Sequence, residues 1–373
     1  MRKFIKVIAL TILVFGAAEA GARALAPGLV EPLEWYTANA RKKVDQMDRL
    51  SEQGGASVVF VGTSMARDGL DPVIFLEANR SFTSAYNAAL SNASPIIMED
   101  WLTREVVPRL HPDLVVWGLE SFVLNDSAPT LRKSIDFYQA APRSKRDPAS
   151  EIETWLDDHL YLFRYQQVLQ RPGEVFRAIR GMTPQPEETD IPFQMNALGR
   201  TTGRVNASFA DVNTEAQGAR LRDGVFVDFT IGGPQLLALR TTVEWLQERE
   251  IDVAFVLMPV LPQYLALHRS ESDYQLFVEQ TYSLAQSENV PVFAPNGPYT
   301  QAEFADLLHL NGEGAEKFTM EVSKWLSDLT DHGDFLGLQV GLGSGGGQGP
   351  SGPGLSIRFH DIRESHPTHL PMG

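Results

Sequence analysis

Short hydrophobic runs alternate with longer amphipathic stretches along most of the chain. Four of these runs are rich in β-branched residues and lack polar alternation, which is typical of buried parallel strands. We expect the strands at 56–62 (ASVVFVG), 113–118 (DLVVWG), 251–258 (IDVAFVLM) and 290–294. Helices are expected at 94–110, 234–250, 270–289 and 312–329. Alternating strands and helices with short connections predict an α/β fold, a three-layer sandwich around a parallel central sheet.

The stretch from about 127 to 230 interrupts this alternation. It is polar and rich in proline, and within it only 150–170 has a helical pattern. We interpret it as a large insertion between core strands, the kind of segment from which substrate-binding loops usually arise. The alternative interpretation is a structural subdomain with no role in recognition.

The N-terminus has the layout of an export signal. Arg2, Lys3 and Lys6 precede an apolar run at 7–18, and Ala18-Glu19-Ala20 follows as a cleavage-like site. Residues 1–27 are therefore predicted to be a signal peptide or a membrane anchor. A bilayer-spanning helix needs about 20 apolar residues, which this segment reaches only if it extends toward residue 25. The basic head places the rest of the chain outside the cytoplasm, in the periplasm or at the cell surface.

The C-terminus changes composition sharply. Residues 341–354 read GLGSGGGQGPSGPG. Such a segment cannot bury enough apolar surface to offset its conformational entropy, so we expect a disordered tail at 334–373. The main domain is then 28–330.

Composition excludes several classes of function. The 373 residues carry a formal net charge of -15, which argues against broad electrostatic binding of nucleic acid. The absence of cysteine excludes a thiolate nucleophile and a cysteine-ligated metal. The sequence has no P-loop and no H-E-x-x-H motif, so we expect neither a cofactor nor a metal.

Two short motifs carry candidate chemistry. Gly62-Thr63-Ser64 ends the first predicted strand, and ligands of open parallel sheets bind at the carboxyl ends of strands. Asp306 and His309 lie three residues apart before the last helix, where one loop would supply a base and the acceptor that orients it. Each motif alone has an ordinary alternative, because serine and aspartate often cap helices. Together they predict a Ser64–His309–Asp306 triad.

The order of these motifs resembles the SGNH (GDSL-like) hydrolase superfamily. Its first block is matched by Gly62-Thr63-Ser64 and its last, D-x-x-H, by Asp306 to His309. An α/β-hydrolase would instead carry G-x-S-x-G in mid-chain. The resemblance covers about 56–329 without the insertion and implies a flavodoxin-like sandwich.

The middle blocks depart from the family pattern. The resemblance implies an oxyanion hole built from the backbone N–H groups of Ser64 and Ala89, with Ala89 in place of the usual glycine. It also implies a third donor, an asparagine, where this chain has Glu120. One such donor is typically worth about 2.7–4 kcal/mol of the barrier. With these departures the chain resembles the divergent, membrane-associated branch of the superfamily, which is linked to O-acylation of envelope polymers.

The resemblance implies an extracytoplasmic serine esterase or O-acyltransferase. Ser64 would attack an ester carbonyl, His309 would take its proton and Asp306 would orient His309. The implied partners are an acylated carbohydrate or small ester, with acetyl as the group, and a membrane-bound acyl-donor protein. One alternative is a non-catalytic SGNH-like scaffold in an envelope assembly. Another is a carbohydrate-binding module whose D-x-x-H motif is coincidental.

Overall fold

The computed structural model describes most of the chain. The described residues are 2–29, 34–140, 155–156, 159–165, 169, 172–181, 195–295 and 297–332. Much of the helix predicted at 150–170 lies outside these residues, as does the whole tail predicted at 334–373. The chain divides into two units, Met1–Leu338 and Gln339–Gly373, and the description below concerns the first.

A five-stranded parallel sheet forms the centre of the domain. Its strand order is β2-β1-β3-β4-β5, and every neighbouring pair is parallel. The strands are β1 (Val58–Val61), β2 (Ala85–Asn87), β3 (Leu114–Leu119), β4 (Asp252–Leu257) and β5 (Val292–Phe293). All residues of β1 and β3 are buried, which explains their uninterrupted apolar sequences. The predicted α/β fold with a parallel sheet is confirmed.

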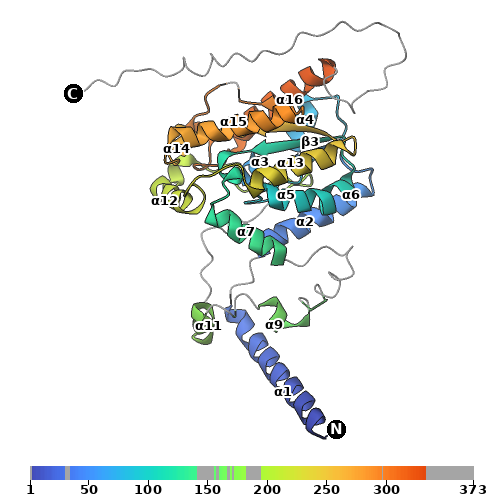
Figure 1. Ribbon diagram of the computed structural model, residues 1–373, viewed down its shortest axis with the longest axis vertical. Helices are drawn as coiled ribbons and strands as arrows, with labels where there is room; N and C mark the ends of the chain where they lie inside the picture. Colours follow the sequence, from blue (N-terminus) through green and yellow to red (C-terminus); the bar gives the residue numbers. More distant parts are fainter. Residues whose placement is uncertain are drawn as a thin grey trace, which may run out of the picture. The chain divides into compact units, whose positions relative to one another are not determined.

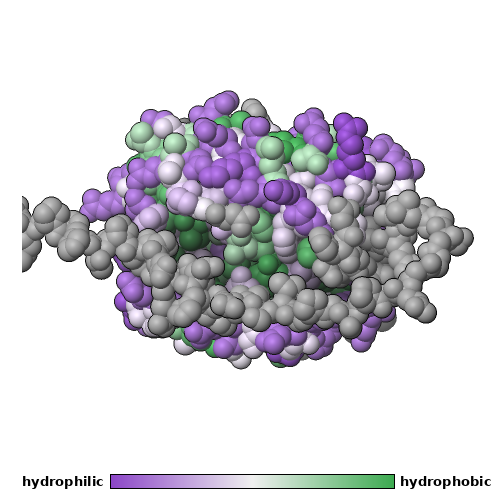
Figure 2. Space-filling view, turned by 90° about the horizontal axis from the view of Figure 1, so that it is seen from above, coloured by the Kyte–Doolittle hydropathy of each residue, from purple (hydrophilic) through white to green (hydrophobic). Residues whose placement is uncertain are grey.

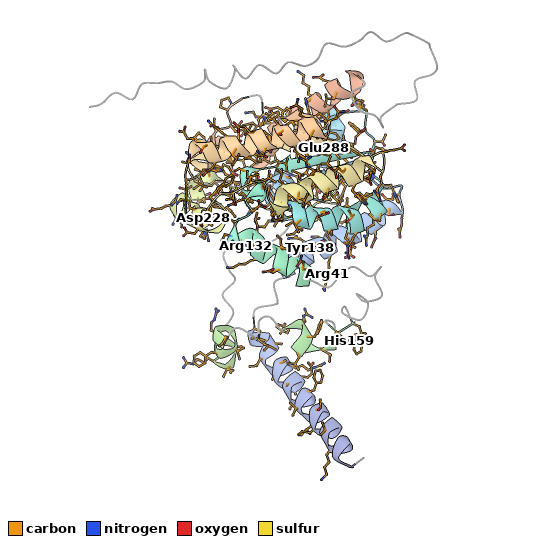
Figure 3. All side chains as sticks on the ribbon, in the orientation of Figure 1. Arg41, Arg132, Tyr138, His159, Asp228 and Glu288 are labelled. Carbon is orange, nitrogen blue, oxygen red and sulfur yellow. The ribbon has the colours of Figure 1, made fainter. Side chains whose placement is uncertain are left out.

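Helices cover the sheet in two layers, as right-handed crossovers require for this strand order. The first layer contains α5 (Pro95–Trp101), α13 (Pro234–Gln247) and α15 (Glu271–Ser287). Figure 1 shows these three along the sheet. Arg240 of α13 donates to Glu288 at 3.0 Å, and Glu288, labelled in Figure 3, follows the end of α15. In the second layer α16 (Gly312–His332) packs against α3 (Ser64–Gly69) and α4 (Pro72–Ala78).

The helix predicted at 94–110 is divided into three pieces. After α5 comes a π-helix, η2 (Leu102–Val106), and then α6 (Val107–Leu110). Pro108 has no N–H to donate, and its ring crowds the carbonyl four residues earlier, so the regular α-helical bonds cannot continue through it.

The predicted insertion includes several elements. They are α7 (Pro129–Ala140), α9 (Tyr161–Arg164), α11 (Pro172–Ile179), the 3-10 turn η4 (Phe209–Asp211) and α12 (Thr214–Gly224). The first of these, α7, packs on α5 and on α2 (Glu34–Ser51), and its Tyr138 (Figure 3) donates to Asp100 Oδ2 at 2.9 Å. The remaining short elements are η1 (Ala26–Gly28), η3 (Ser121–Leu124), α14 (Pro262–Leu265) and η5 (Gln301–Glu303).

The N-terminal segment forms the helix α1 (Arg2–Leu25), which packs against α9. Its Glu19 accepts hydrogen bonds from the backbone N–H groups of Tyr161 (3.0 Å) and Leu162 (2.9 Å). Val7, Leu10 and Leu13 of this helix are exposed. Within the described ranges, no helix combines the length and the apolar character needed to cross a bilayer.

The face of the domain seen in Figure 2 is largely polar. Figure 2 shows hydrophilic residues over much of the face that it presents, with hydrophobic residues between them. This distribution agrees with the net charge of -15 and with a core that lies on both sides of the sheet.

Candidate active site

A tight turn after β1 presents Ser64. Gly62 has a φ of +134°, and a Cβ on it would lie 2.6 Å from the Gly118 carbonyl oxygen, so the position requires glycine. Thr63 then caps α3, because its hydroxyl accepts a hydrogen bond from the Met65 N–H at 3.2 Å. Ser64 is consequently the first residue of α3, at the carboxyl end of a central strand.

The loop before α16 holds both Asp306 and His309. Asp306 Oδ1 accepts the backbone N–H groups of Leu308 (2.8 Å) and His309 (2.9 Å), which folds the loop around the carboxylate. The Ala305 N–H donates to the His309 carbonyl at 2.8 Å and closes the turn. The three-residue spacing therefore places the carboxylate beside the imidazole.

The structure brings the three predicted residues together. His309 Nε2 lies 2.8 Å from Ser64 Oγ, and His309 Nδ1 lies 2.8 Å from Asp306 Oδ2. All three residues are less than 10% exposed. These distances suit the passage of a proton from the hydroxyl to Nε2 while the carboxylate holds Nδ1.

Asp306 is ionised in this environment. Burial acts to raise the pKa of its carboxyl, but the neighbouring His309 and Arg204 outweigh burial and hold the pKa well below its usual range. An ionised carboxylate accepts from Nδ1–H, which leaves Nε2 as the acceptor for the serine hydroxyl.

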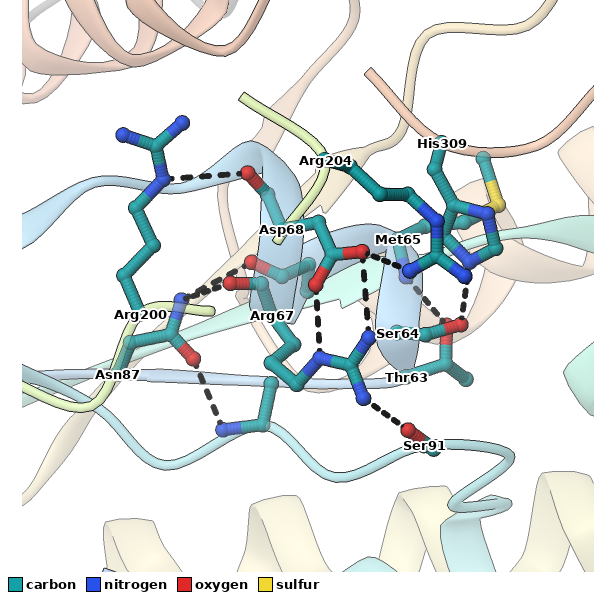
Figure 4. Close-up of polar contacts among 12 residues, drawn as sticks. Thr63, Ser64, Met65, Arg67, Asp68, Asn87, Ser91, Arg200, Arg204 and His309 are labelled. Carbon is teal, nitrogen blue, oxygen red and sulfur yellow. Dashed lines mark hydrogen bonds and ion pairs between the residues drawn. The ribbon is translucent and has the colours of Figure 1, made fainter. Parts of the chain in front are cut away.

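A buried network of arginine and aspartate lies behind the triad (Figure 4). Arg204 contacts Asp68 Oδ2 at 2.5 Å and Asp306 Oδ2 at 3.4 Å. Asp68 is also paired with Arg67 at 2.7 Å, and Arg67 donates to Ser91 Oγ. Burial acts to raise the pKa of Asp68, but the two guanidinium groups lower it overall.

The structure shows how the predicted oxyanion donors are placed. Ser64 starts α3, so its N–H has no acceptor within that helix. The Ala89 N–H, in contrast, donates to Asn87 Oδ1 at 3.1 Å. The Asn87 amide in turn donates to the Ala66 carbonyl at 3.0 Å and to the Leu70 carbonyl at 2.8 Å. Ala89 would have to exchange this partner before it served an oxyanion.

Glu120 occupies the position at which the resemblance implies an asparagine donor. It follows β3 and is 1% exposed. The Thr63 hydroxyl donates to its Oε1, whereas Oε2 has no hydrogen-bond partner among the residues that the structure describes. Its carboxyl thus contacts the residue next to the nucleophile.

Three basic residues near the site were not found from the sequence. Lys43 on α2 is fully buried, and its Nζ donates to the carbonyls of Asn87 and Gly199. Arg200 binds Asp71, and Arg204 reaches the triad itself. For Arg200 and Arg204, the one signal in the sequence was that both lie in a short turn, 196–204, within the predicted insertion. No group of three or more potential metal ligands lies together in the described part of the chain.

Comparisons with known proteins add little beyond this geometry. No protein-family model and no curated protein matches the sequence. Among solved structures, the chain is similar to a lipase/acylhydrolase from Enterococcus faecalis, with 13% identity and a TM-score of 0.36 over 73% of this chain and 95% of that one. The functional argument below therefore rests on the residues of the site.

Proposed function

We propose that this chain is an SGNH-type serine esterase or O-acyltransferase with Ser64, His309 and Asp306 as its catalytic triad. The observation that supports the proposal is the continuous contact from the Ser64 hydroxyl through the His309 ring to an ionised Asp306, with 2.8 Å at each step. A serine, a base and an orienting carboxylate in this arrangement are what acyl transfer requires.

The reaction has two halves. Ser64 Oγ forms a bond to the ester carbonyl carbon while its proton moves to His309 Nε2, and Asp306 stabilises the resulting imidazolium. The imidazolium then protonates the leaving alcohol as the ester C–O bond breaks. In the second half, water or a sugar hydroxyl bonds to the acyl carbon while its proton moves to His309; the bond between Ser64 Oγ and the acyl carbon then breaks, and the imidazolium returns the proton to Oγ. Water completes an esterase cycle, and a sugar hydroxyl completes a transferase cycle.

The negative charge on the substrate oxygen needs donors at the same place. We assign the Ser64 N–H to this role, and the Ala89 N–H once it exchanges its bond to Asn87. The Ser64 N–H suits this role because Ser64 is the first residue of α3 and its N–H has no acceptor within that helix.

The proposal extends to location and substrate. The protein is exported or anchored by its N-terminal segment and acts outside the cytoplasm on an acetylated envelope or exported polysaccharide, with a membrane-bound protein as acyl donor. The basic head and the apolar run at 7–18 support the location, and the resemblance to the polysaccharide O-acylation branch supports the substrate.

The test measures reaction at Ser64 in the full chain. Wild type, Ser64→Ala and His309→Ala are treated with a fluorophosphonate probe and, separately, with a small acetyl ester. Loss of Ser64 or His309 should lower turnover roughly 10⁴-fold or more. Ser121→Ala is the matched control, because Ser121 Oγ also lies 2.9 Å from a histidine, His268, whose Nδ1 contacts no carboxylate in the described residues.

A non-catalytic scaffold is the second candidate. The engaged Ala89 N–H and the glutamate at position 120 favour it, because both weaken an oxyanion hole. It predicts that folded wild type neither labels nor turns over ester. Labelling that disappears in Ser64→Ala and survives in Ser121→Ala would exclude it. A carbohydrate-binding module predicts glycan binding that His309→Ala leaves intact.

A further inference from the structure

Glu120 follows the neighbouring strand β3 and contacts the turn that carries Ser64. The strands β1 and β3 pair in parallel with Val61 opposite Trp117, so the residues after each strand leave the sheet at the same edge. The turn after β1 carries Thr63 and Ser64, and the end of β3 carries Glu120. The Thr63 hydroxyl donates to Glu120 Oε1 and also accepts from the Met65 N–H, so one hydroxyl joins the carboxyl to the first turn of α3.

In the part of the chain that the structure describes, no positively charged group is paired with this carboxyl. Among the described residues Glu120 takes part in no ion pair; the Thr63 hydroxyl on the β1–α3 turn donates to it, and the Tyr264 hydroxyl on α14 interacts with it electrostatically. Its Oε2 is buried without a partner. The carboxyls of Asp68 and Asp306 are also buried but differ from it, because each contacts at least one cationic or imidazole group. A buried unpaired carboxylate is far more costly than a buried neutral acid.

The electrostatics agree with this geometry. Burial raises the pKa of Glu120 to about 8, against an opposing contribution from the Thr63 hydrogen bond. Glu120 is accordingly protonated at neutral pH and begins to ionise in the mildly alkaline range.

We propose that Glu120 is a positioning residue that works as a neutral carboxylic acid: it fixes Thr63, and with it the turn that presents Ser64, and its ionisation switches the site off. This inference rests on the proposed function. The anion that forms at higher pH would lie beside the turn where negative charge develops on the substrate oxygen, and it would oppose that charge. Glu120 itself contacts Thr63 and not the reacting atoms.

The first experiment is the pH dependence of kcat/KM for ester turnover by the full chain. Wild type should lose activity with an apparent pKa near 8. Glu120→Ala should lower the neutral-pH value about tenfold, the equivalent of one hydrogen bond to Thr63. Glu120→Gln should recover most of that loss, because its amide oxygen accepts from Thr63, and its alkaline limb should disappear, because an amide does not ionise. Glu105→Gln is the control, since Glu105 is a buried glutamate that pairs with Arg109, and it should keep the limb.

A second measurement does not depend on activity. Infrared difference spectra between wild type and Glu120→Gln should show a protonated carboxyl C=O stretch at neutral pH that disappears in alkali. Absence of this band would overturn the inference even if Ser64 is reactive. A folded Glu120→Gln that is as inactive as Glu120→Ala, or that keeps the alkaline limb, would overturn it as well. If wild-type Ser64 does not react at all, the proposed function fails and the positioning role fails with it, whereas the band still reports the protonation of Glu120.

Discussion

Replacing Asp306 with asparagine should leave its loop folded and reverse the tautomer of His309. Asp306 Oδ1 accepts two backbone N–H groups at 2.8 and 2.9 Å, so the amide oxygen of asparagine must occupy that position. The amide NH₂ then takes the place of Oδ2, 2.8 Å from His309 Nδ1, and donates to it, whereas Oδ1, 2.9 Å from the same nitrogen, has its two lone pairs engaged by the backbone donors. Nδ1 becomes an acceptor, and the ring proton moves to Nε2, where it faces Ser64 Oγ.

A ring protonated on Nε2 cannot take the serine proton. The wrong tautomer costs roughly 10⁴ in kcat in serine hydrolases, which corresponds to about 5.5 kcal/mol of barrier. The lost contact with Arg204 does not account for such an effect, because that contact is 3.4 Å long and Arg204 is partly exposed. Arg204 also keeps its shorter contact with Asp68, at 2.5 Å, when Asp306 becomes neutral.

The assay is fluorophosphonate labelling of Ser64 at neutral pH, with chemical denaturation of each variant to verify its fold. Asp126→Asn is the control for loss of a carboxylate away from the imidazole: Asp126 accepts the Gly233 N–H on Oδ2 and the Gln235 N–H on Oδ1, so its amide gives up one of these acceptors, and among the described residues Asp126 contacts no imidazole. We expect slow labelling in a folded Asp306→Asn and wild-type labelling in Asp126→Asn. Wild-type labelling of a folded Asp306→Asn would refute the orienting role of Asp306.

Three further predictions concern stability, and chemical denaturation tests each of them. Gly62→Ala should destabilise the protein by about 2–5 kcal/mol, because Gly62 has a positive φ and the added Cβ would clash with the Gly118 carbonyl. Gly54→Ala is the control: Gly54 has a φ of +103° but its Cβ would meet no neighbouring atom, so the substitution should cost only about 1–2 kcal/mol. Lys43→Met should cost about 1–3 kcal/mol for each of the two carbonyls that lose their donor, and the exposed Lys42→Met should cost little; equal effects would contradict the buried role of Lys43. The folded pKa of Asp306 is depressed, so its carboxylate stabilises the fold above its unfolded value of about 3.9 and loses that contribution as pH falls toward the folded pKa. Asp306→Asn should therefore show a weaker loss of stability between about pH 4 and pH 2 than wild type, and an unchanged slope would contradict this reasoning.

The parts of the fold that could be predicted are those that the local sequence determines. The strands β1 and β3 are buried on both faces, so their residues form uninterrupted apolar runs. The strand β2 was missed because its three residues, Ala-Tyr-Asn, form no such run. Its place beside β1 depends on pairing with a strand that lies 24 or more residues away.

The same distinction between local sequence and long-range contacts applies to the candidate site. Asp306 and His309 could be paired from the sequence because they share one loop, and Ser64 because it follows a recognisable strand. Arg204 could not, since its contact with Asp306 depends on how the insertion folds back against the His309 loop. The sequence also assigns an N–H to Ala89 but cannot show that Asn87 already accepts from it.

Ser64 and His309, the proposed nucleophile and base, are 245 residues apart in the chain. During synthesis at roughly 5–20 residues per second, roughly 12–50 s separate the appearance of Ser64 from that of His309. Throughout that interval the nascent polypeptide carries an ordinary, unreactive hydroxyl. Under the proposed function, reactivity at Ser64 thus begins only after His309 has been synthesised and α16 has docked against α3.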